Sequence, residues 1–267
     1  SLEEITSRKY LTFMERSLSY TFSQGRNTGL SFSNAFLNKR ATYGVGVFRE
    51  TDDSGNGFGE ESNYTVTTRF TFLPWYLQKG EKLLHLGLSY SHKFRNGQTT
   101  RFRTRPEAHL GPRFVDTGKF VSDGINYINP EVALVHGPAS LQFEWSSALV
   151  NSDEADNPHF NSWYISGSYF LTGEHRAYKT SNGAFGRIKL DENFNSNGGW
   201  GALELAARYS TIDLNDGPIE GGELANITVG LNWYLNPNVR IMFNYVHADI
   251  EDSGEADIFQ TRFQVDF

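Results

Sequence analysis

The chain has 267 residues, of which 15% are aromatic and 26 are Gly, and its formal net charge is -7 at pH 7. The absence of Cys excludes a disulfide framework, a thiolate nucleophile and a cysteine-ligated metal site. An acidic sequence pI of about 5.5 disfavours a nucleic-acid-binding protein, for which a basic surface is expected.

The N-terminal residues do not share the pattern of the rest of the chain. The opening SLEEITSRKY has no basic region followed by an apolar core, so no signal peptide is visible in it. Residues 1–27 are predicted to form a loop or short helix that leads into a barrel wall.

From residue 28 onward, the chain consists of segments of about ten residues in which apolar and polar side chains alternate, separated by Gly, Asn, Asp and Pro. In the segment 223–235, for example, Ile227 and Val229 share one face, and Asn226 and Thr228 share the other. This alternation predicts about 12 strands. The predicted strands are 28–38, 41–49, 63–74, 82–93, 99–109, 128–136, 140–150, 160–171, 200–211, 223–235, 239–250 and 256–267.

These strands fit a membrane better than a soluble core. No stretch approaches about 18 consecutive apolar residues, which excludes a transmembrane helix. A chain rich in aromatic residues with a mean hydropathy of -0.48 is typical of strands with one face toward lipid and the other toward water. The sequence therefore predicts an all-β fold, an antiparallel transmembrane β-barrel in the bacterial outer membrane, surrounded by the lipid bilayer and lipopolysaccharide.

Short turns alternate irregularly with long polar connections, and barrels of this kind have short periplasmic turns and longer outer loops. If the turns near residues 39 and 237 lie at the same end, an even number of strands must separate them. The assignment places nine strands between them. One crossing is therefore missing or invented, and we expect the error within 110–127 or 183–190.

The chain ends with FQTRFQVDF, which places Phe263, Val265 and Phe267 on one face of a terminal strand. A strand that ends on an aromatic residue is similar to the C-terminal signal by which outer-membrane barrels are recognised for insertion. We predict that these three residues form this signal, and the alternative is an ordinary edge strand.

Several stretches of the sequence resemble the phosphate-selective porin family, the O and P porins. In chain order they are RKYLTFMERSL, KLLHLGLSYSH, FRTRPEAHL, FLTGEHRAY, GAFGRIKL, ALELAARYSTIDLND, GLNWYLNPNVR and DIFQTRFQVDF. The resemblance implies a porin barrel of about 16 strands that assembles as a homotrimer, with inward loops rich in Arg and Lys.

Fewer strands are predicted here than the resemblance implies. We therefore expect the chain to match the C-terminal three-quarters of the family. Residues 28–267 are expected to form the transmembrane barrel, and the N-terminal strands of that barrel are expected to be missing. Because an open sheet edge in lipid leaves backbone groups unpaired, we expect either a truncated chain or an N-terminal segment or other chain that closes the barrel.

Charged side chains that line a channel set its ion preference. Arg101, Arg103 and Arg105 alternate along one predicted strand, which would place their guanidinium groups about 7 Å apart on one face. Because guanidinium binds phosphate or carboxylate in a bidentate manner, we predict an anion path there. The same inward parity collects Arg69, Lys93, Arg208, Arg240 and Arg262, against Glu131, Glu144, Glu204 and Asp266. The alternative is that these cations pair with lumenal carboxylates and only solvate the wall.

Two long connections, 110–127 and 172–197, are predicted to fold inward and form a constriction, although mobile outer loops are the alternative. Their basic residues are Arg113, Lys119, Arg176, Lys179, Arg187 and Lys189. The seven His have no metal-ligand spacing, so neither a metal nor another cofactor is expected.

The leading interpretation of the sequence is a passive diffusion channel for small anions, such as phosphate or related oxyanions. One alternative is an outer-membrane barrel that acts as a structural scaffold or as the partner of another surface protein. A barrel enzyme such as a lipase or protease would need a nucleophile with a His in reach, and no local signature of that kind is present. We therefore expect no enzymatic activity.

Overall fold

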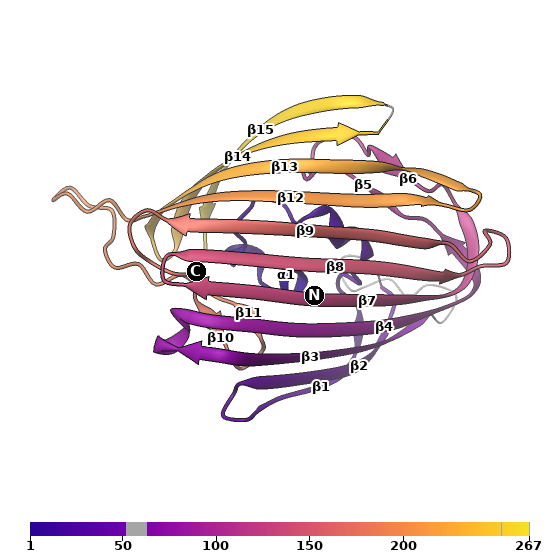
Figure 1. Cartoon of the computed structure of the whole chain (residues 1–267), viewed down its shortest axis with the longest axis horizontal. Helices are drawn as coiled ribbons and strands as arrows, with labels where there is room; N and C mark the ends of the chain where they lie inside the picture. Colours follow the sequence, from indigo (N-terminus) through magenta and orange to yellow (C-terminus); the bar gives the residue numbers. More distant parts are fainter. Residues whose placement is uncertain (52–62, 252, 267) are drawn as a thin grey trace.

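The computed structural model describes residues 1–51, 63–251 and 253–266. Its largest unit is an antiparallel sheet of long strands. These are β1 (Thr28–Phe36), β2 (Ala41–Arg49), β3 (Tyr64–Leu77), β4 (Lys82–Thr100), β7 (Phe120–His136), β8 (Ala139–Asn151), β9 (His159–Phe170), β12 (Ala202–Asp216), β13 (Ile219–Asn236), β14 (Val239–Ile250) and β15 (Gly254–Val265). Within the described residues they form one 11-stranded sheet, in which each long strand pairs with the next one along the chain (Figure 1).

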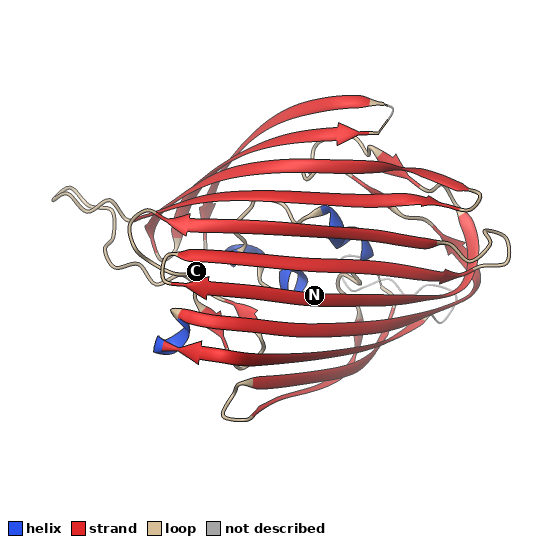
Figure 2. Ribbon diagram, viewed as in Figure 1, coloured by secondary structure: helices blue, strands red, loops and turns tan. Residues whose placement is uncertain are grey.

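Short elements occupy the remaining segments. Two small strand pairs lie in long connections, and the helices are short (Figure 2). The pairs are β5 (Arg103–Thr104) with β6 (Val115–Asp116) and β10 (Tyr178–Lys179) with β11 (Ala184–Phe185). The helices are α1 (Leu2–Ile5), η1 (Arg8–Tyr10), η2 (Leu18–Phe22) and η3 (Gln78–Gly80). None of the helices in the described ranges is long and apolar enough to cross a membrane.

The two faces of the sheet have the reverse of the polarity found in a soluble protein. On β13, the side chains of Ile227 and Val229 are 49% and 48% exposed, whereas those of Asn226 and Thr228 are buried. The same alternation places large apolar side chains on the outside of the neighbouring strands. A wall that exposes apolar groups and buries polar ones is stable where its outer face meets lipid. The all-β antiparallel fold expected from the sequence is confirmed.

The sheet has two free edges in the part of the chain that is described. β1 pairs only with β2, and β15 pairs only with β14. The two edge strands lie at opposite margins of the sheet in Figure 1.

The separate strand predicted over 99–109 is wrong. β4 continues to Thr100 through a register shift between Phe94 and Gln98. At this bulge Asn96 and Gly97 have φ angles of 50° and 78°, so the Asn-Gly pair bends a continuous strand and does not end it.

This correction also resolves the parity problem. Without the invented strand, eight described strands (β2, β3, β4, β7, β8, β9, β12 and β13) lie between the turns near 39 and 237. The error therefore lay in 99–109, and not in 110–127 or 183–190 as expected.

Candidate functional site

Residues 1–27, here called the inner segment, lie against the polar face of the sheet. Three side chains of the wall donate hydrogen bonds to its backbone carbonyls. Arg240 reaches Leu11 O at 2.8 Å, Arg262 reaches Met14 O at 2.8 Å and Asn232 reaches Thr12 O at 2.8 Å. Two of the predicted pore-lining cations, Arg240 and Arg262, therefore hold a segment of this chain in place.

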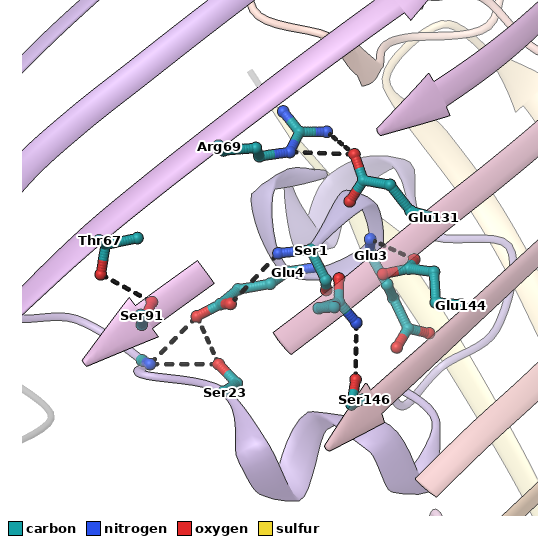
Figure 3. A network of polar contacts seen from close by, with 12 residues as sticks. Ser1, Glu3, Glu4, Ser23, Thr67, Arg69, Ser91, Glu131, Glu144 and Ser146 are labelled. Atoms are coloured by element: carbon teal, nitrogen blue, oxygen red, sulfur yellow. Dashed lines mark hydrogen bonds and ion pairs between the residues drawn. The ribbon is translucent and has the colours of Figure 1, made fainter. Parts of the chain in front are cut away.

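A buried network of charges fixes the start of the inner segment. The backbone N–H of Glu3 donates to Glu144 Oε1 at 2.8 Å, and Arg208 Nη1 lies 3.2 Å from Glu3 Oε1 (Figure 3 shows Glu3 beside Glu144). Burial raises the pKa of Glu3 to about 7; Arg208 opposes this effect and the nearby Glu144 adds to it. Glu3 is therefore a group that titrates near neutral pH.

The loop 101–119, between β4 and β7, folds inward. Its Glu107 is buried and accepts hydrogen bonds from Arg208 and Ser210 of β12, and from Thr228 of β13 at 2.7 Å. Phe102 packs edge-on against Phe22 of the inner segment, with ring centroids 5.5 Å apart. Both contacts bring this loop onto the same polar face as the inner segment.

Arg101, Arg103 and Arg105 do not form the straight ladder that the sequence predicts, because they lie in the loop 101–119 and not along one long strand. Arg101 forms an ion pair with Asp116 at 2.5 Å. Among the residues that the structure describes, no ion pair involves Arg103, Arg105 or Arg113. Desolvation, followed by the positive charges of Arg103 and Arg105, lowers the pKa of Arg113, and the carboxylate of Asp116 opposes this effect. Arg103 is the strand partner of Asp116 in the β5–β6 pair, so the three guanidinium groups lie around one carboxylate, whose ion pair is with Arg101. We call Arg103, Arg105 and Arg113 the arginine cluster.

Two further predicted pore-lining cations, Arg69 and Lys93, form ion pairs with carboxylates. Arg69 Nε donates to Glu131 at 3.0 Å (Figure 3). Arg69 Nη2 also donates to Gly183 O at 2.8 Å. Lys93 donates to Glu50 at 2.6 Å, an acceptor that it shares with Arg95. The charge of Arg69 is therefore balanced by one carboxylate, whereas Lys93 and Arg95 share a single carboxylate and keep a net positive charge.

The connection 171–201 lies at the opposite end of the strands from the loop 101–119, because successive connections of a meander alternate between ends. Its Tyr178 is hydrogen-bonded to His85 of β4 at 2.6 Å. Arg176 is buried, donates to Gln142 at 2.9 Å and lies 3.5 Å from the ring centroid of Phe185. This connection therefore also covers part of the polar face, at the end that carries the short turns.

The other basic residues predicted for the constriction lie near this end or at the surface. Lys179 and Arg187 lie 4.9 and 5.5 Å from the ring centroid of Tyr10, and Arg187 also pairs with Asp266. Lys119 and Lys189 are exposed. No position gathers all of the predicted constriction residues.

At the C-terminus, the side chains of Phe263 and Val265 are 65% and 51% exposed on the outer face, whereas Phe267 lies outside the described residues.

The sequence predictions missed Glu3 and Glu107, which organise the inward segments. Neither belongs to a periodic pattern, and only the place of Glu107 in the stretch FRTRPEAHL could have singled it out. In the described part of the chain, no group of three or more acidic or His side chains could hold a metal ion.

Comparison with known proteins gives consistent matches. The family model for phosphate-selective porin O and P matches residues 1–267. The chain is 27% identical over 289 residues to an uncharacterized protein of Caulobacter vibrioides, covering 100% of the chain and 57% of that relative. It is also 27% identical over 313 residues to Porin O of Pseudomonas aeruginosa, covering 100% of the chain and 68% of that protein. The expected restriction of the match to the C-terminal three-quarters of the family is wrong, because the family model matches the chain from its first residue to its last.

Proposed function

The chain belongs to the phosphate-selective porin O and P family, and on this premise we propose that it forms a passive diffusion channel for small anions in the bacterial outer membrane. Porins are channels, so the chain is not an enzyme. The chain spans 57% of the length of one curated relative and 68% of the other.

The arginine cluster is the observation that supports anion preference. Its three guanidinium groups lie in a loop that folds onto the polar face, and they have no ion pair within the described ranges. Unpaired guanidinium groups attract anions and bind the oxygens of phosphate in a bidentate manner. Phosphate and related oxyanions are therefore the solutes that we propose.

The remaining inward cations contribute less to this preference. Arg208 is paired with Glu3 and Glu107, and Arg69 is paired with Glu131. A paired charge adds little to the potential that an approaching ion meets, because the field of its partner cancels most of it. This contrast makes the arginine cluster the dominant source of selectivity in our proposal.

We further propose that the protein is a homotrimer whose apolar outer face contacts the lipid bilayer and lipopolysaccharide.

An alternative role as a scaffold or partner of another surface protein is favoured by one observation. The inner segment, the loop 101–119 and the connection 171–201 all occupy the polar face, which narrows the space left for solute.

The test is the reversal potential of the purified protein in a planar bilayer across a KCl gradient, repeated with phosphate added. Anion preference with block by phosphate is the expected result. Cation preference would leave a general porin, and the absence of conductance would favour the scaffold role.

A further inference from the structure

The loop 101–119 carries a carboxylate, Asp116, among its arginines. Asp116 accepts hydrogen bonds from Arg101 Nε at 2.7 Å and from Arg101 Nη2 at 2.5 Å, one on each of its two oxygens. This parallel, two-bond contact is also the geometry in which guanidinium binds phosphate. Asp116 therefore occupies, on Arg101, the place that an oxyanion would take.

The backbone of the β5–β6 pair holds Asp116 beside Arg103 as well. The two residues are opposite each other in the antiparallel register, and opposite residues project from the same face of a strand pair. A backbone hydrogen bond from Thr117 N to Phe102 O at 2.9 Å continues this pair, and Gly118 N donates to Asp116 Oδ1 at 3.0 Å. The position of the carboxylate is therefore fixed by several backbone groups, and not by Arg101 alone.

The opposite face of this strand pair is buried. Phe102 and Val115 are 6% and 2% exposed, and both belong to an apolar cluster of inward residues. Because side chains alternate along a strand, Asp116 and its neighbouring arginines lie on the face that points away from this cluster. The side chains of Arg101 and Asp116 are 35% and 29% exposed, so a solute can reach both.

Asp116 offsets only part of the positive charge around it. The segment 101–116 contains four arginines and two carboxylates, Glu107 and Asp116. Glu107 is buried and bonded to Arg208, so its charge balances one on β12. The hydrogen bond from Arg101 lowers the pKa of Asp116, which therefore stays ionised. One exposed negative charge thus stands against four positive charges, and the segment still attracts anions.

A carboxylate at this place affects how long an anion stays. A conducting channel must bind an ion strongly enough to admit it and weakly enough to release it. Four guanidinium groups without a counter-charge would hold phosphate tightly. A fixed carboxylate repels the bound phosphate, and it takes the place of phosphate on Arg101 as the anion leaves.

We propose that Asp116 is a specificity-determining residue of the channel, which competes with oxyanions for Arg101 and Arg103 and so shortens the time that phosphate stays bound. This inference rests on the anion preference proposed above and concerns the regulation of the same site. The arginine cluster attracts the anion, and Asp116 promotes its release.

The test is the block of the single-channel KCl current by inorganic phosphate, which gives a half-blocking concentration and a mean block time. Asp116→Asn keeps the shape of the side chain and removes its charge. We expect the half-blocking concentration to fall about tenfold, because a unit charge a few ångströms away changes the binding of a divalent anion by roughly this factor even in water. The mean block time should lengthen by a similar factor, since most differences in affinity arise from the dissociation rate.

Two further variants and a control separate the role of Asp116 from a general effect of charge. Arg101→Gln should raise the half-blocking concentration, because Asp116 then competes for Arg103 alone. The double variant Arg101→Gln, Asp116→Asn should return it to near the wild-type value, because one charge of each sign has been removed. Asp153→Asn removes an exposed carboxylate from the turn between β8 and β9, at the same end of the strands, and should be blocked as the wild type is.

The outcomes distinguish this inference from the proposed function. If the wild type prefers anions and is blocked by phosphate, an unchanged half-blocking concentration in Asp116→Asn would overturn this inference alone. Weaker block with a noisier current in that variant would do the same, since it would show that Asp116 only holds the loop together. An equal fall in Asp153→Asn would also overturn it, because the effect would then come from the net charge of the channel. Cation preference in a KCl gradient, with no block by phosphate in any of the proteins, would overturn both this inference and the proposed anion preference.

Discussion

Glu107 in the loop 101–119 is paired with Arg208 of β12, although 101 residues separate them in the chain. Arg208 also contacts Glu3, through its other terminal nitrogen. One buried guanidinium therefore joins the sheet, the inner segment and the loop that carries the arginine cluster. The position of the proposed anion path depends on this junction.

Replacing Glu107 by Gln should destabilise the protein and loosen the loop 101–119. Breaking a buried ion pair by removing its only partner costs about 3 kcal/mol or more, and the cost here should be smaller because Arg208 keeps its ion pair with Glu3. The unfolding midpoint in detergent should fall, and single-channel current noise should rise. Glu220→Gln, at an exposed site, is the matched control and should change neither. A Glu107→Gln protein with wild-type stability and noise would contradict the anchoring role.

The stability of the protein should fall as the pH rises from about 4.5 to 7. The pKa of Glu3 in the folded state is raised to about 7 by burial, so the folded protein holds this proton more tightly than the unfolded chain does. The stabilisation from Glu3 is complete below pH 4.5, the unperturbed pKa, and is lost as the pH passes through the folded pKa. The loss amounts to at most about 3 kcal/mol.

Unfolding midpoints measured across this pH range should therefore decline in the wild type. In Glu3→Gln, which cannot ionise, that part of the decline should disappear. Identical pH profiles for the two proteins would show that Glu3 does not titrate in this range.

Replacing Glu131 by Gln should increase anion preference. This change leaves the guanidinium of Arg69 without its carboxylate partner while preserving a hydrogen-bond acceptor of the same shape. The reversal potential should shift toward the anion equilibrium value, and the shift should shrink at high salt because mobile ions in the channel screen the unbalanced charge of Arg69. Arg69→Gln should shift the potential in the opposite direction. Shifts of the same sign in the two variants would contradict the charge balance described for this pair.

The wall of the sheet could be predicted from sequence because its alternation is local. In β13, Ile227 and Val229 face outward and Asn226 and Thr228 face inward, as the period of two requires. Such a pattern depends only on which face meets lipid, and it holds over the whole length of a strand.

The same local pattern was misleading at 99–109. Arg101, Arg103 and Arg105 alternate with Phe102 and Thr104, as they would on a strand. However, Phe102 packs against Phe22 of the inner segment on the polar face of the sheet, and it does not face lipid. An apolar residue packed on an inward segment has the same periodicity as one that faces a membrane, so sequence could not distinguish the two.

The sequence could not predict the partners of the inward charges either. Arg240 and Arg262 are on the inward face, as their parity predicts, but they bind backbone carbonyls of the inner segment. More than 200 residues separate these groups in the chain. The inner segment has no periodicity that would place it on the sheet, so whether an inward arginine meets solute or protein had to come from the structure.

We propose that the arginine cluster of the loop 101–119 sets the anion preference, and the reversal potential across a KCl gradient measures this preference. The double variant Arg103→Gln, Arg105→Gln is compared with Lys39→Gln, Lys79→Gln, which removes the same charge from exposed turns at the other end of the strands. We predict a clear shift away from anion preference in the arginine variant and the wild-type potential in the lysine variant. Equal potentials in the wild type and the arginine variant would show that Arg103 and Arg105 do not set the anion preference.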